Sequence, residues 1–161
     1  MDASLCKDSI ERLLGEECGL LAKLEALLDT EHQFLNGNDI DALEQAGAAR
    51  HACTGALVRI EDERRSLCRM SGKSSDRRGL EELLKWCDPN NTLKPRWMEC
   101  TERATRCRDR NDRNGIVVAV RLKRVEGMLS VITGRDKAPA TYGPQRGYAQ
   151  AQVGRMIRSE A

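Results

Sequence analysis

The spacing of apolar residues over positions 10–35 constrains the fold of this chain more than any other feature. Apolar side chains recur every seven residues in two parallel series, and Ile10 and Leu24 begin a third column. The two series are Leu13, Leu20, Leu27 and Phe34, and Leu14, Leu21, Leu28 and Leu35. Three adjacent columns form a helical stripe wide enough to face two partner helices. The pattern predicts a helix over residues 4–35, about 48 Å long at a rise of ~1.5 Å per residue.

Similar spacing predicts two more long helices. Asp39 is a suitable N-cap for a second helix over residues 39–71. A third is predicted over 92–133, because the register runs unbroken through the apolar run 116–120, which alone could equally be a strand. Its expected seam consists of Leu93, Trp97, Cys100, Ala104, Cys107, Asn111, Asn114, Val118, Arg121, Val125, Met128 and Ile132.

A short amphipathic helix is expected over residues 78–87, ended by Asp88 and the proline after it. Residues 134–161 contribute no apolar column, which favours a flexible tail. The expected fold class is therefore all-α: an elongated antiparallel bundle of three long helices plus a short helix, with a flexible C-terminal tail. The predicted domains are a helical bundle over 1–133 and the tail over 134–161.

The charge is unevenly distributed. Residues 1–63 carry 14 acidic and 5 basic side chains, whereas residues 64–161 carry 11 acidic and 22 basic ones. A basic half can indicate nucleic-acid binding, but the acidic half allows helices of the same chain to pair. The arginine run is interrupted by aspartates and has no interleaved aromatic residue, so we expect it to face solvent or the acidic first helix. This run contains Arg103, Arg106, Arg108, Arg110 and Arg113.

Seven scattered cysteines form no CxxC pair and have no histidine at ligand spacing, so we expect them to be packing residues rather than disulfide or zinc ligands. His32 and His51 lack the context of a helical-bundle metal site. The start of the chain shows no signal-peptide pattern, and the longest apolar run is far too short for a membrane span. We therefore expect a soluble, cytoplasmic protein without metal, cofactor or enzymatic activity.

Two features remain that suggest binding. Asn111 and Asn114 fall on the predicted seam, where polar side chains can determine register and partner choice. The tail carries apolar and aromatic groups, three of them at helical spacing, which is typical of an arm that becomes ordered on a partner. These tail groups are Tyr142, Tyr148, Val153, Met156 and Ile157.

With these residues the chain resembles the FlgN-type flagellar export chaperones over nearly its whole length. The resemblance rests on a leucine-rich first helix and on the motif Asn111-x-x-Asn114-Gly115 in the last long helix. Downstream, Tyr142-Gly143 is followed by Gly147, one residue later than is usual in that family, as though Arg146 were inserted.

The resemblance implies a cytoplasmic chaperone that binds the hook–filament junction proteins FlgK and FlgL. It would prevent their premature assembly and assist their delivery to the flagellar type III export gate at the membrane. The expected client-binding residues are Tyr142, Gly143, Gly147, Tyr148, Val153, Met156 and Ile157. Two alternatives stay open: a basic helical module associated with nucleic acid, and a generic coiled-coil interaction module.

Overall fold

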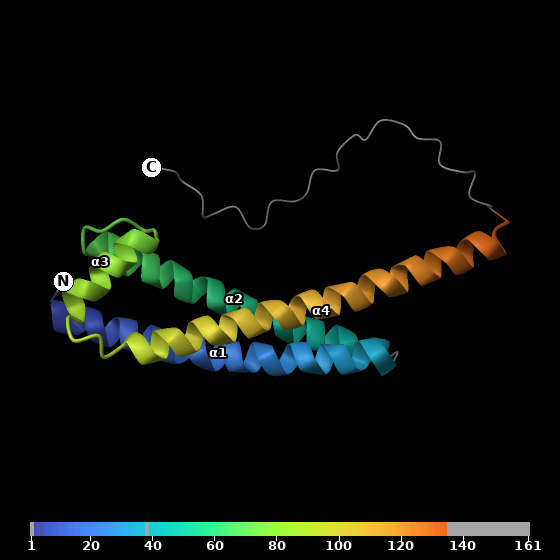
Figure 1. The fold of residues 1–161 in the computed structure, drawn as a ribbon, viewed down its shortest axis with the longest axis horizontal. Helices are drawn as coiled ribbons and strands as arrows, with labels where there is room; N and C mark the ends of the chain where they lie inside the picture. Colours follow the sequence, from blue (N-terminus) through green and yellow to red (C-terminus); the bar gives the residue numbers. More distant parts are fainter. Residues whose placement is uncertain (1, 38, 135–161) are drawn as a thin grey trace, which may run out of the picture. The chain divides into compact units, whose positions relative to one another are not determined.

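The computed structural model describes residues 2–37 and 39–134, which form four α-helices and contain no β-strand (Figure 1). The helices are α1 (Ala3–Gly37), α2 (Ile40–Met70), α3 (Arg77–Cys87) and α4 (Lys94–Ile132). The all-α prediction is confirmed. The expected bounds agree to within two residues at every end, and α4 continues without a break through the apolar run at 116–120.

The chain divides into two units, residues 1–123 and the part from 124 onward. The first unit contains α1, α2, α3 and most of α4. Of the second unit, the structure describes only the end of α4 and the two residues after it. The boundary expected after residue 133 remains a prediction.

Side-chain caps begin two of the helices. Asp39 accepts a hydrogen bond from the Ala42 amide at 3.0 Å, as the sequence predicted for the start of α2. Asp76 caps α3 in the same way, accepting from the Gly79 amide at 2.8 Å. A Cβ at Gly79 would lie 1.9 Å from the carbonyl oxygen of Ser74, so only glycine fits this tight approach of the loop to α3.

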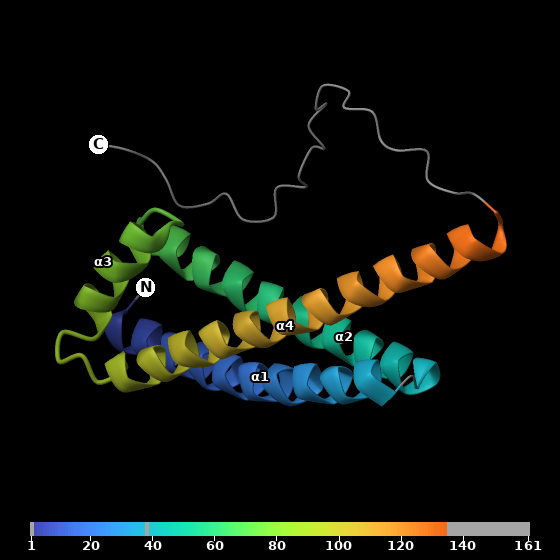
Figure 2. The ribbon, with the colours of Figure 1, turned by 45° about the vertical axis from the view of Figure 1, so that its right-hand side comes forward.

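Helix α1 is the centre of the first unit. It lies antiparallel to α2 and parallel to the first part of α4, which runs beside it in both views (Figures 1 and 2). Its wide apolar stripe faces both neighbours: the Cys53 thiol of α2 donates to the Leu20 carbonyl, and the Cys100 thiol of α4 donates to the Leu14 carbonyl. The stripe therefore has the two partner helices that its width predicted.

A buried arginine joins the three long helices. Arg64 of α2 is 8% exposed and forms ion pairs with Glu17 of α1 and with Glu61 one turn away. Its guanidinium also lies 5.4 Å from the ring centre of Trp97 on α4, a cation–π distance. The charge is thus compensated where α1, α2 and α4 come together.

A buried aspartate holds the turn between α3 and α4. Asp88 accepts hydrogen bonds from the Leu93 amide and the Thr92 hydroxyl, both at 2.8 Å, and pairs with Lys7 of α1 at 3.3 Å. Burial alone would raise the pKa of Asp88, but these donors outweigh it and lower the pKa to about 2. The carboxylate therefore anchors the start of α4 to the N-terminal part of α1.

Candidate functional site

The contact between α1 and α4 repeats every seven residues with a constant offset. Three side chains of α4 donate to backbone carbonyls of α1, each 86 positions earlier in the chain. The pairs are Cys100 with Leu14 at 3.5 Å, Cys107 with Leu21 at 3.5 Å and Asn114 with Leu28 at 2.8 Å. Small or polar side chains at these α4 positions allow the two backbones to approach closely.

The third pair contains one of the motif residues. Asn114 is 5% exposed, and its Nδ2 donates to the Leu28 carbonyl while its Oδ1 lies 3.0 Å from Nδ1 of His32. A buried amide with both ends satisfied can hold two helices in one register. The seam position predicted for Asn114 is confirmed.

The other two residues of the motif, Asn111 and Gly115, are not buried. Asn111 is exposed, so its predicted seam position is wrong: the side chain lies outside the narrow strip of α4 that α1 covers. Gly115 is also exposed, and a Cβ there would meet nothing within 4 Å. Neither packing nor backbone conformation therefore requires glycine at position 115 within the described residues.

Beside the seam, arginines of α4 pair with carboxylates of α1. Glu25 accepts from Arg103 and Arg110 at 3.1 Å and from Arg106, and Asp29 accepts from Arg110 and Arg113 at 3.0 Å. Burial would raise the pKa values of both carboxyls, but the guanidinium groups outweigh it and lower them. Pairing of the arginine run with the acidic first helix is confirmed for these four arginines.

Beyond Asn114, α4 exposes an apolar face. Nine of the fifteen exposed large apolar side chains in the described residues lie between 116 and 132. Five of them follow a 4-3-4-3 spacing that places them on one face of the helix, with exposures from 41% to 81% across the whole set of nine. These five, which we call the α4 stripe, are Val118, Leu122, Val125, Leu129 and Ile132.

The exposure of this face corrects the sequence analysis, which expected the seam to stay buried to residue 132. Val118, Val125, Met128 and Ile132 are all exposed. The buried series along α4, which consists of Cys100, Cys107 and Asn114, ends at Asn114. The heptad pattern in the sequence continues past this last buried residue.

Soluble proteins rarely expose large contiguous apolar patches unless these bind a partner. The α4 stripe has the spacing of a helix that packs against another helix. A useful signal was already present in the sequence, because the third predicted helix is about ten residues longer than the first. These extra residues have no counterpart of equal length in the first helix.

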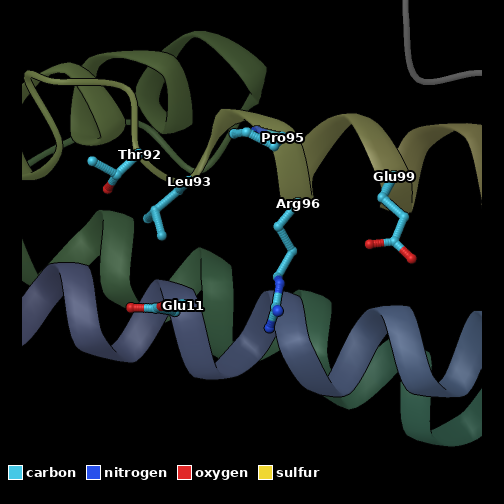
Figure 3. A pocket seen from close by; sticks show the side chains of 6 residues that line it. All are labelled: Glu11, Thr92, Leu93, Pro95, Arg96 and Glu99. Atoms are coloured by element: carbon cyan, nitrogen blue, oxygen red, sulfur yellow. The ribbon is translucent and has the colours of Figure 1, made fainter.

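One hollow of the first unit, about 350 Å³, lies between α1 and the start of α4, where Arg96 extends towards α1 (Figure 3). Gly15 provides room for this arginine, since a Cβ there would lie 3.3 Å from its Nη1. Thr92, the hydroxyl at its edge, already donates to Asp88. The carboxylate that accepts from this hydroxyl has a pKa lowered to about 2, so it is a weak base for activating a nucleophile.

Among the described residues, no group of histidine, cysteine or acidic side chains has the arrangement of a metal site. Six of the seven cysteines are buried, as packing residues should be, and Cys18 is partly exposed. His51 is exposed, and His32 is the partner of Asn114. In the part of the chain that the structure describes, no helix has the length and apolar character needed to cross a bilayer.

The predicted tail residues lie outside the described residues, so the structure does not place them. They are Tyr142, Gly143, Gly147, Tyr148, Val153, Met156 and Ile157. Their assignment to client binding stays a prediction.

The described residues thus form a helical protein with an exposed apolar face on α4. The chain belongs to the FlgN family, whose model, described as FlgN protein, matches residues 5–150. This membership makes it a chaperone of flagellar biogenesis with a role in flagellar protein export. No curated protein and no solved structure gives a significant match.

Proposed function

We propose that this chaperone binds the C-terminal helical regions of the hook–filament junction proteins FlgK and FlgL in the cytoplasm. Binding would keep these clients unassembled and assist their delivery to the type III export gate at the membrane. Family membership supports the class of client, and the exposed α4 stripe is the observation that carries the proposal. The chaperone needs no catalytic group for this role.

We assign the α4 stripe to an amphipathic helix of the client. A partner with apolar residues at matching spacing would cover side chains that are otherwise left in water, at roughly 25 cal/mol for each Å² buried. Lys123 and Arg124 lie exposed next to the stripe, so the matching client helix would carry acidic residues at its margin. The tail residues, Tyr142 and Tyr148 foremost, would add contacts beyond the stripe.

The arginine run argues against the alternative of nucleic-acid binding. Arg103, Arg106, Arg110 and Arg113 are engaged with Glu25 and Asp29, so four arginines of the most basic segment are held in ion pairs within the chain. A phosphate backbone would have to displace these carboxylates.

A matched pair of substitutions tests the surface. Leu122 in the stripe and Val58 on α2 are 59% and 60% exposed, so an aspartate at either site costs the fold little. We expect Leu122→Asp to weaken binding of purified FlgK or FlgL at least about tenfold, or ~1.4 kcal/mol, in calorimetry. Val58→Asp should bind like the unchanged chain.

Circular dichroism and the melting temperature should be unchanged in both variants. Equal affinities of Leu122→Asp and Val58→Asp would remove the stripe from the client site. Concentration-dependent dimerisation that Leu122→Asp abolishes, without any effect on FlgK or FlgL, would instead support a coiled-coil module.

A further inference from the structure

Two cysteines from different helices meet at the α1–α4 seam. Sγ of Cys18 lies 2.7 Å from Sγ of Cys100, and both are free thiols. Each also contacts the backbone of the opposite helix: Cys18 approaches the Arg96 carbonyl at 3.9 Å, and Cys100 donates to the Leu14 carbonyl at 3.5 Å. Contacts with the backbones of both helices therefore keep the two sulfur atoms close together.

We propose that Cys18 and Cys100 form an oxidative modification site, at which a disulfide covalently joins α1 to α4. The two thiols lie close enough that a small movement of the side chains would bring the sulfur atoms to bonding distance. The disulfide would be intramolecular, so its formation needs no second protein chain.

The pair is also accessible. Cys18 is partly exposed, whereas the other six cysteines are buried. Cys100 lines another hollow, of about 170 Å³, together with Glu17, Arg64 and Trp97. Since a water molecule occupies ~30 Å³, hydrogen peroxide can enter a hollow of this size. An oxidant can thus reach the pair from the surface.

A second close pair provides the contrast. Cys6 and Cys87 also interact with each other, but both are buried at 0% and 5% exposure. Burial raises the pKa of Cys6 to about 12 and raises that of Cys87, which leaves little of the reactive thiolate at neutral pH. Proximity without access should leave this pair reduced.

The chemistry balances with hydrogen peroxide as the oxidant. Cys18 loses its proton, and its thiolate attacks one peroxide oxygen. The O–O bond breaks, Cys18 becomes a sulfenic acid, and the departing hydroxide takes up the Cys18 proton to form water. The Cys100 sulfur then attacks Cys18 Sγ, the S–O bond breaks, and the departing hydroxide takes the thiol proton to form water. Two thiols are oxidised, and one peroxide is reduced to two waters.

The order of these steps follows from the surroundings. Burial, the hydrogen bond with Cys18 and the nearby Glu17 carboxylate raise the pKa of the Cys100 thiol well above its usual range. Cys100 is therefore a poor first reactant, and Cys18 meets the oxidant first. Cys100 resolves the sulfenic acid because it is already in contact with it.

The link would close a large loop, because the two cysteines are 82 positions apart. Cross-links that close long loops restrict the unfolded chain most, so the oxidised protein should melt higher by roughly 10 °C. The disulfide would stabilise the α1–α4 seam, where Cys100, Cys107 and Asn114 stand at positions that large apolar side chains could otherwise fill.

The test treats the reduced full-length chain with a small excess of hydrogen peroxide and maps its peptides by mass spectrometry without reduction. We expect a Cys18–Cys100 link and a raised melting temperature that dithiothreitol reverses. Cys18→Ser and Cys100→Ser should abolish both effects. Cys107→Ser is the matched control, one heptad along the seam with the same type of contact to α1, and should behave like the unchanged chain.

Circular dichroism of each reduced variant confirms that it is folded, and Cys18→Ser, at the partly exposed site, perturbs packing least. Three results would overturn the proposal: sulfinic acid at Cys18 without a link, a link that joins two chains, or preferential oxidation of Cys6 and Cys87. None of these measurements involves a client, so they are independent of the proposed chaperone function.

Discussion

The buried amide of Asn114 shows how a single motif residue can serve the fold. It bridges the Leu28 carbonyl and the His32 ring, whereas Asn111, three positions earlier in the same motif, is exposed. An exposed motif residue with no packing role is a better candidate for contact with another protein than a buried one. The two asparagines therefore have separate roles, which the spacing in the sequence could not distinguish.

A pair of alanine variants tests this division. Asn114→Ala leaves the Leu28 carbonyl and His32 without their partner, so we expect it to lower the free energy of unfolding by about 1–3 kcal/mol. Asn111→Ala should change it by less than about 0.5 kcal/mol, as is usual for exposed positions. Urea titration followed by circular dichroism measures both. Equal losses in the two variants would contradict the assignment of Asn114 alone to the seam.

At the scale of the helices, the sequence predicted the elements well and their partners less well. Heptad spacing places the helices to within two residues, and the cap at Asp39 is correct, because propensity, capping and periodicity are local properties. Burial along α4 is not local. The apolar repeat of 118–132 looks the same with or without a partner, and its spacing does not show that the buried series of α4 ends at Asn114.

The carboxylates of α1 make the α1–α4 contact sensitive to acid. The pKa values of Glu25 and Asp29 are lowered in the folded protein, and that of Asp88 is lowered to about 2. Protonation therefore favours the unfolded chain. Their stabilisation is fully present above the ordinary carboxyl pKa, near ~4, and is lost as the pH falls below it towards the folded values.

We expect the urea midpoint to be nearly constant from pH 7 to pH 5 and to fall steeply below pH ~4. Glu25→Gln should cost about 1–2 kcal/mol at pH 7, because three arginines lose a charged acceptor, and should flatten the fall. Glu99→Gln is the control, since Glu99 pairs only with Arg103 within α4 in the described residues and is half exposed. An unchanged pH profile in Glu25→Gln would mean that the ion pairs contribute little.

At the scale of the whole molecule, the family match and the described structure overlap but do not coincide. The match extends to residue 150 and includes Tyr142, Gly143, Gly147 and Tyr148, whereas the structure describes the chain only to 134. The exposed α4 stripe therefore lies just before the segment that the sequence analysis selected for client binding. A client helix that covers the stripe could continue into contacts with this segment.

The last prediction separates the two surfaces. A chain that ends at residue 133 should keep its helical content and melting temperature, because the described seams and ion pairs lie before that residue. It should bind FlgK or FlgL at least about tenfold more weakly, a loss of ~1.4 kcal/mol, since tyrosine rings and hydroxyls are frequent contributors to interfaces. Calorimetry of both chains against the same client measures the difference.

Combining this truncation with Leu122→Asp determines whether the stripe and the tail act independently. If they contact separate parts of the client, their losses should add to within about 0.5 kcal/mol. A smaller combined loss would mean that the tail binds only where the stripe has already positioned the client helix. Equal affinities of the truncated and full-length chains would assign binding to the helices alone, and Tyr142 and Tyr148 would then need another partner.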